Sequence, residues 1–173
     1  REDEGASGYS AGCRFPVFAI DGHYLHPARW PNDGGFATAK AADIVMSGSS
    51  SASTVFRQPA SGASAYDLTD ANGYVWGFDG CAYRTQAKKI LGREGENLTV
   101  ASNSDIYFLQ PGSRYQVRNV LEELDVPGEW CWDAGTRKLY FIPPEGFSGE
   151  SVIELGHTLD HFFWIRTTGT RLE

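Results

Sequence analysis

The sequence predicts an all-β protein, an antiparallel β-sandwich with a β-barrel as the alternative, and two observations predict it. Twenty glycines and eight prolines interrupt the 173 residues at short intervals, which favours short strands over long helices. Between these turns lie short apolar runs, and almost no stretch repeats with the 3.6-residue period of an amphipathic helix. Strands joined by short turns are typical of antiparallel sandwiches and barrels.

In the first half of the chain, two strand-like runs flank Asp21-Gly22, a dipeptide that favours a two-residue hairpin turn. Residues 31–36 (PNDGGF) are expected to form a loop. Residues 37–46 fit either a short helix or a strand, and TVFRQ at residues 54–58 is a predicted strand. The structure of residues 37–72 is left open.

The strand pattern is clearer from Tyr74 onward. The predicted strands are YVWGFDG, RTQAKKIL, LTVAS, DIYFL, YQVRNV, EWCWD, RKLYFIP, SVIEL and HFFWIR. RTQAKKIL and LTVAS are expected to form a hairpin with the longer loop GREGEN. VLEELD has the composition of one or two helical turns, so a short helical turn is expected near residues 120–125, before Pro127.

Length and charge limit the domain count and the partners. A chain of 173 residues suits one domain with its own core. The net charge of −7 opposes binding to nucleic acids and anionic membranes, but not to neutral glycans. No apolar run reaches the roughly 20 residues that span a bilayer. We therefore expect neither nucleic acid nor membrane as a partner.

The ends of the chain and its cysteines complete this outline. Residues 1–14 form an acidic, glycine-rich extension, residues 15–155 the predicted sandwich, and residues 172–173 a possible cloning remnant. Because there is no initiator methionine, we expect a piece of a longer protein. The three cysteines (Cys13, Cys81 and Cys131) cannot all pair with one another; a Cys13–Cys81 disulfide and three buried free thiols are both open.

The stretch LDVPGEWCWDAGTRKLYFIPPEG (residues 124–146) places acids beside tryptophans, as sugar-cleaving sites do. On a strand, Glu129 and Asp133 share a face with Cys131, but four residues put them about 13 Å apart. A glycosidase pair lies about 5–9.5 Å apart, so Glu129 would need a cross-strand acid. The alternative interpretation is a solvated strand face followed by a polar turn.

Three tryptophans are candidates for carbohydrate binding. Trp130 and Trp132 share the face opposite Glu129, and Trp76 lies on another predicted strand. Exposed, such rings stack on sugars; buried, they are large core residues. The partner strand at residues 137–142 is apolar on both faces, which favours the core interpretation.

No cofactor or metal site is expected, and no catalytic residue is assigned. His157 and His161 have a His-x-x-x-His spacing, but the flanking residues are strand-like, and on an extended chain the two rings lie too far apart to bind one ion. Nucleophile-elbow, zinc-protease and phosphate-loop motifs are absent from the sequence.

Three blocks of the sequence carry a resemblance to a known family. LHPARWPNDGGF, NGYVWGFDGCAYRTQAKKI and, most specifically, SRYQVRNVLEELDVPGEWCWDAGTRKLYFIPPEG resemble the β-sandwich domain of right-handed parallel β-helix carbohydrate-active enzymes, including xylosidase-like glycoside hydrolases. The resemblance covers residues 15–166, although residues 37–72 match poorly. Cys131 departs from the pattern, which has a tyrosine or a similar residue there.

The resemblance implies a non-catalytic domain of a larger, secreted bacterial enzyme that degrades polysaccharides, in an extracellular or cell-surface location. In that family the catalytic carboxylates lie on β-helix rungs, so none can be carried onto this chain. Residues 156–171 resemble the start of a truncated rung. The implied partners are the parent β-helix domain, on which the sandwich packs, and a plant polysaccharide or oligosaccharide whose cleft it helps to wall.

Two other interpretations remain open. One is an autonomous carbohydrate-binding module that uses exposed aromatic rings. The other is a free-standing hydrolase built on Glu129 and a cross-strand acid, although we expect no catalysis from this chain alone. Asn119, Asp125 and Glu129 also have a simpler role available, since they bracket a Pro-Gly turn whose backbone amides they can bond.

Overall fold

The computed structural model describes residues 17–33, 35–46, 54–58, 73–78, 85–101 and 110–156. Within these residues the secondary structure consists of β strands and two single-turn 3-10 helices. The strands are β1 (Val17–Ile20), β2 (His23–Tyr24), β3 (His26–Pro27), β4 (Arg29–Trp30), β5 (Ala37–Thr38), β6 (Ile44–Met46), β7 (Thr54–Arg57), β8 (Tyr74–Phe78), β9 (Thr85–Glu94), β10 (Asn97–Val100), β11 (Arg114–Arg118), β12 (Glu129–Asp133), β13 (Lys138–Phe141) and β14 (Ile153–Gly156), and the 3-10 helices are η1 (Ala41–Asp43) and η2 (Leu121–Glu123). The predicted all-β, antiparallel fold is confirmed.

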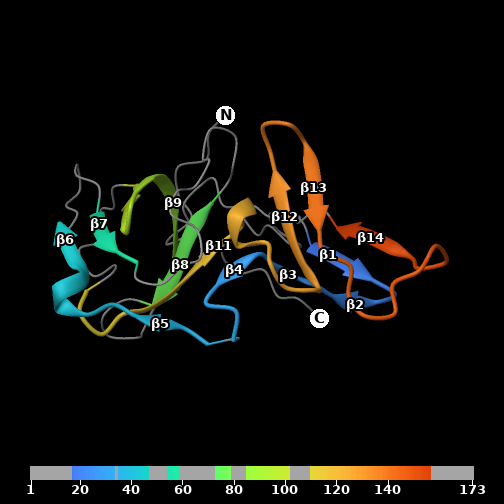
Figure 1. Ribbon diagram of the computed structural model, residues 1–173, viewed down its shortest axis with the longest axis horizontal. Coiled ribbons are helices and arrows are strands. Elements are labelled where there is room, and N and C mark those ends of the chain that lie inside the picture. Colours follow the sequence, from blue (N-terminus) through green and yellow to red (C-terminus); the bar gives the residue numbers. More distant parts are fainter. Residues whose placement is uncertain are drawn as a thin grey trace, which may run out of the picture.

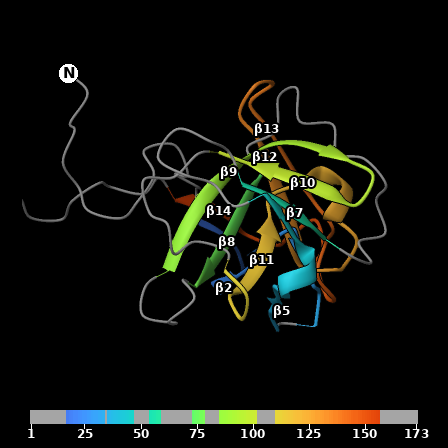
Figure 2. The ribbon, with the colours of Figure 1, turned by 90° about the vertical axis from the view of Figure 1, so that its left-hand side faces the viewer.

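The largest sheet has the order β4-β11-β8-β9-β10-β7-β6, with β5 also paired to β11. Figure 2 shows this sheet curling around itself, as expected for the barrel-like alternative of a sandwich. The curl encloses the first core, whose buried side chains include Val75, Ile90, Leu98, Tyr115 and Val117.

Two small sheets, β14-β1-β2 and β13-β12-β3, occupy the other half of the molecule (Figure 1). They enclose a second core of Phe18, Ile20 and Trp130, with Phe141 and Phe147 packed against it. All the strand pairs are antiparallel in the described part of the chain, except that β12 pairs with β3 in parallel.

The structure confirms several local predictions and corrects one. Asp21 and Gly22, with φ angles of 51° and 75°, make the expected hairpin turn between β1 and β2. The predicted loop GREGEN is shorter than expected. Because Gly95 adopts a φ of 57°, residues 95–96 make the turn alone, and the strands continue through Glu94 and from Asn97.

The ambiguous stretch from residue 37 to 46 contains both kinds of element, namely β5, η1 and β6. Helix η2 lies where the short helical turn was expected, and the chain leaves it before Pro127. The predicted strands DIYFL and HFFWIR, the extension at residues 1–14 and residues 157–173, including most of the expected rung, lie outside the described residues.

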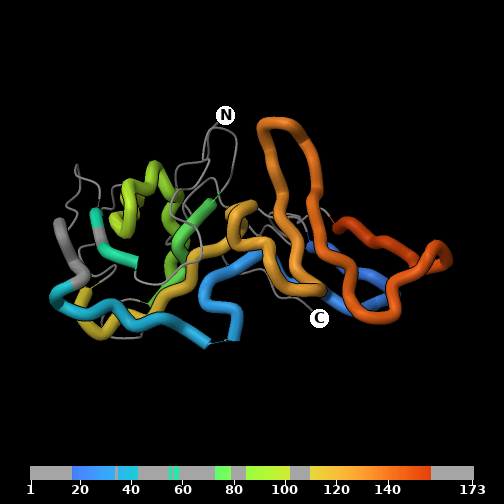
Figure 3. The backbone as a smooth tube through the Cα atoms, viewed as in Figure 1, coloured from blue at the N-terminus to red at the C-terminus, as the bar shows by residue number. Residues whose placement is uncertain are grey.

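Two segments of the described chain connect the halves of the molecule. Figure 3 shows the chain crossing between the halves near residues 25–30 and again near residues 118–130. The crossings are bonded to each other, because the Ala28 amide donates to the Trp130 carbonyl at 2.6 Å and the Asn119 amide donates to the Ala28 carbonyl at 2.7 Å. No helix among the described residues is long and apolar enough to cross a membrane.

Candidate functional site

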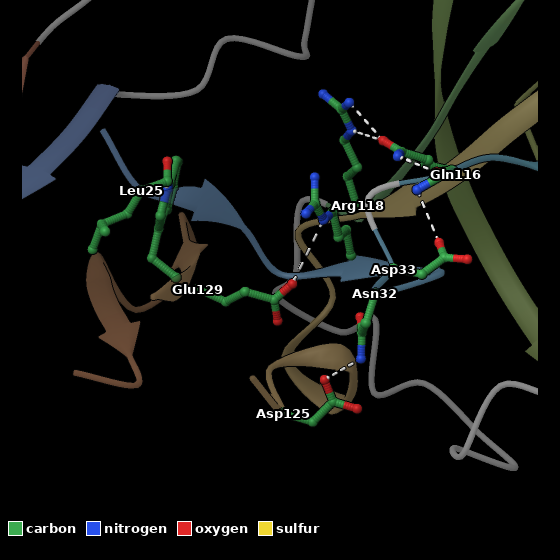
Figure 4. A network of polar contacts seen from close by, with 10 residues as sticks. Leu25, Asn32, Asp33, Gln116, Arg118, Asp125 and Glu129 are labelled. Atoms are coloured by element: carbon green, nitrogen blue, oxygen red, sulfur yellow. Dashed lines mark hydrogen bonds and ion pairs between the residues drawn. The ribbon is translucent and has the colours of Figure 1, made fainter. Parts of the chain in front are cut away.

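A polar cluster lies at the junction of the two halves, around the carboxyl group of Glu129. Glu129 begins β12, where the parallel register places it beside His26 of β3. Its side chain is only 6% exposed, and its Oε1 lies 3.9 Å from the Nε of Arg29 on β4. Figure 4 shows this cluster with the Asn32–Asp125 pair below Glu129 and the Arg118–Gln116 pair above it.

The surroundings of Glu129 favour its neutral form. Burial raises the pKa of Glu129 to about 7, and the negative charge of Asp125 adds to the rise. The backbone amides of Asp125 and Val126 and the charge of Arg29 act against it. The Oε2 atom of Glu129 has no hydrogen-bond partner among the described residues. The group can therefore gain or lose a proton near neutral pH, but it is enclosed.

The predicted solvated face of β12 is wrong for Glu129 and Cys131. Cys131 is 2% exposed, and burial, with the nearby charges of Glu122 and Asp133, raises the pKa of its thiol to about 12. The reason is that β12 is covered on both sides: Trp130 faces the second core, while η2 and the turn after it lie against Glu129 and Cys131. Cys131 is a buried free thiol, and Cys13 and Cys81 lie outside the described residues.

Asp133 has a structural role in its own turn, as the polar-turn interpretation predicted. Its Oδ1 accepts from the amides of Gly135 and Thr136 at 2.9 and 3.1 Å, and its Oδ2 accepts from the Thr136 hydroxyl at 2.6 Å. These bonds to the Thr136 side chain and to the backbone lower the pKa of Asp133. With its carboxylate engaged in this turn, Asp133 makes no pair with Glu129.

Of the three residues expected to bond the Pro-Gly turn, only Glu129 lies against its amides. Asn119 instead fixes the junction, because its Nδ2 donates to the Trp132 carbonyl at 2.9 Å and its Oδ1 accepts from the Trp132 amide at 2.8 Å. Asp125 accepts a hydrogen bond from Asn32 at 2.7 Å. Asn32 and Asp125 are 93 residues apart, so the sequence alone does not place them together.

Trp130 and Trp132 belong to the second core. Trp130 is 3% exposed, packs edge-on against Phe18 at 6.2 Å between ring centroids, and donates its indole N–H to the Leu25 carbonyl at 3.0 Å. Trp132 is partly buried against the same core. The core interpretation is confirmed for Trp130, whose ring lacks the exposure that sugar stacking needs.

Trp76 has different surroundings, on a face of the large sheet. Its ring lies 5.4 Å from that of Phe36 and 5.8 Å from that of Phe78, and the Arg118 guanidinium carbon lies 4.1 Å from its centroid. A carbohydrate-binding role for Trp76 stays a prediction. Arg118 and Gln116 were not among the predicted site residues, although the alternation in RYQVR places them with Arg114 on one strand face.

Within the described ranges, no group of three or more His, Cys, Asp or Glu side chains is arranged to hold a metal ion. His157 and His161, which supplied the metal motif, lie outside those ranges.

Comparison with known proteins gives a result at the level of the fold. No protein-family model matches the sequence. No curated protein matches it either. A solved structure described as "Glycoside hydrolase" is similar over 84% of this chain, with a TM-score of 0.55 and 15% identity. The chain spans only 27% of that protein. It therefore has the fold of a β-rich domain resembling part of a glycoside hydrolase.

Proposed function

We propose that the chain is a non-catalytic β-sandwich domain of a larger, secreted polysaccharide-degrading enzyme of the glycoside hydrolase type. It packs on a parallel β-helix and helps to wall the substrate cleft. The observation that carries the proposal is the structural similarity to 27% of a glycoside hydrolase. The β-helix and xylosidase-like part of the proposal rests on the resemblance of the blocks around ARWPN and residues 113–146.

The state of the candidate carboxylates supports a non-catalytic role. Glu129 is buried, Asp133 is bonded within its own turn, and Asp125 is bonded to Asn32. Hydrolysis of a glycoside needs two carboxyl groups that flank a bound sugar. These three side chains instead hold turns and the junction in place.

An exposed apolar edge supports packing on a neighbouring domain. Among the described strands, β14 lies at the edge of its sheet, and Ile153 and Leu155 on it are 51% and 52% exposed. The adjoining Val152 and Val17 are 61% and 41% exposed. Apolar edge strands are rarely left open to solvent, because they pair readily with other chains.

The first test is an assay of this chain on aryl-xylosides, xylan and pectin. We expect no turnover above buffer, since the acids are engaged in structure. Turnover at ordinary enzyme rates that is lost in Glu129→Gln would overturn the proposal in favour of a hydrolase built on Glu129. A second test is the sequence of the longer parent protein, in which we expect β-helix rungs after residue 166.

A further inference from the structure

One face of the large sheet carries a row of arginines beside a row of aromatic rings. On β11, Arg114, Gln116 and Arg118 alternate with the core residues Tyr115 and Val117. The antiparallel register places Gln116 opposite Trp76 and Arg118 opposite Tyr74 on β8, and opposed side chains share a face. We call the set Arg114, Gln116, Arg118, Phe36, Trp76 and Phe78 the arginine–aromatic face.

The two guanidinium groups of this face are held in fixed orientations. The Arg114 guanidinium carbon lies 4.6 Å from the Phe78 centroid and 5.7 Å from that of Phe36. Arg118 lies over Trp76, and its Nε and Nη2 donate to the Gln116 Oε1 at 2.8 and 2.6 Å. Gln116 is itself 1% exposed and donates to the Gly35 carbonyl at 2.6 Å. Such preorganisation lowers the entropy lost on binding a ligand.

The arginine–aromatic face carries two arginines on one strand. Among the described residues, neither Arg114 nor Arg118 forms an ion pair with a carboxylate. Arg29 lies opposite Arg118 in the neighbouring strand and is a like charge, although its Nε lies 3.9 Å from the Glu129 carboxyl group. This concentration of positive charge occurs in a chain whose net charge is −7. Arg114 is exposed, while the other members are partly or fully buried, so Arg114 is the group that a ligand meets first.

We infer that the arginine–aromatic face binds an anionic saccharide, with a uronate carboxylate on the guanidinium N–H groups of Arg114 and Arg118, which lie over the rings of Phe78 and Trp76. A guanidinium binds a carboxylate through two parallel hydrogen bonds. A neutral sugar would have to displace Arg118 from Trp76 in order to stack there. The saccharide part of this inference rests on the proposed function, whereas the anion part rests on the face itself.

The test is calorimetric titration of the chain with short oligogalacturonates and with the same oligomers fully methyl-esterified. Esterification removes the charge and keeps the sugar backbone. We expect at least tenfold weaker binding of the ester, and weakening of the acid form by 0.5 M NaCl, because salt screens exposed charges. Equal binding of both forms, or no binding of the acid form at low salt, would overturn the inference.

Variants locate the site. Arg114→Ala should weaken oligogalacturonate binding at least tenfold. Arg114→Lys should restore binding only in part, because lysine keeps the positive charge but lacks the two parallel N–H donors of a guanidinium group. Arg137→Ala is the matched control, since it removes an exposed guanidinium from the turn between β12 and β13. An equal loss in both alanine variants would indicate a non-specific charge effect and contradict the inference.

Titration with polyglutamate, an anion that contains no sugar, distinguishes a failure of this inference from a failure of the proposed function. Weak polyglutamate binding beside tight oligogalacturonate binding supports the saccharide assignment. Equally tight binding of both through Arg114 overturns that assignment and leaves an anion site. Hydrolytic turnover by the chain would overturn the non-catalytic role without changing either result.

Discussion

Glu129 is held in its protonated form by burial up to near-neutral pH. Its pKa is about 7 in the folded protein against 4.5 as the reference value, so the native state binds more protons than the unfolded chain between these pH values. Stability should therefore fall as the pH rises from about 4.5 to about 7, by up to about 3 kcal/mol at 1.36 kcal/mol per pKa unit.

The change that tests this is Glu129→Gln, which resembles the protonated form at every pH. We expect the variant to match the wild type at pH 5 and to be more stable at pH 8, measured by urea unfolding across this range. His26 acts in the opposite direction, because burial and the charges of Arg29 and Arg118 lower its pKa, but it is present in both proteins. Parallel stability profiles would refute the assignment.

Which residues make the junction was only partly predictable. The sequence identified Glu129, Trp130 and Trp132 as residues of interest, because acids and tryptophans stand out in a short motif. The burial of Glu129 was not predictable, since it depends on η2 folding over the second face of β12. Alternation along a strand shows that residues i and i+2 share a face, but it does not show what covers that face.

At the scale of elements, β8 and β11 approach each other closely at Gly77. A Cβ at this position would lie 2.7 Å from the Arg114 carbonyl oxygen and 3.1 Å from the Tyr115 Cβ. Gly77→Ala should therefore force the strands apart and cost about 1–3 kcal/mol of unfolding free energy, as overpacking does. It should also weaken anion binding, because Arg114 moves with β11.

Gly92→Ala on β9 is the control for that change, because an added Cβ there meets nothing within 4 Å. We expect its unfolding free energy to stay within about 0.5 kcal/mol of the wild type in urea titrations. A loss in Gly92→Ala equal to that in Gly77→Ala would contradict the prediction, because the cost could then not come from the close approach of β8 and β11.

Most strand positions in the described ranges followed from alternation and turn residues, whereas their pairing did not. The hairpins β1–β2, β9–β10 and β12–β13 join neighbours in sequence, and their turns contain glycine or aspartate. The pairs β3–β12 and β5–β11 bring distant segments together. Which of these strands pair depends on which strand faces the two cores bury, and this cannot be read from a single sequence.

The apolar edge at β14 should control self-association of the isolated chain. Leu155→Lys places a charge on this edge, a common means of blocking edge-to-edge pairing. We expect the wild type to associate as its concentration rises and the variant to stay monomeric, measured by sedimentation velocity. Leu121→Lys on η2 is the control, since Leu121 is 44% exposed but lies away from the edge. Equal behaviour of the two variants would argue against the edge as an interface.

The pairing of β1 with β14 has a consequence for synthesis. Val17 is aligned with Gly156, so these partners stand near opposite ends of the described chain. As the ribosome releases the chain from its N-terminus, β1 and β2 emerge early but cannot complete their sheet until β14 has followed. The curled sheet can close while they wait, because β4 to β11 supply its strands. The half of the protein that begins first is thus completed last.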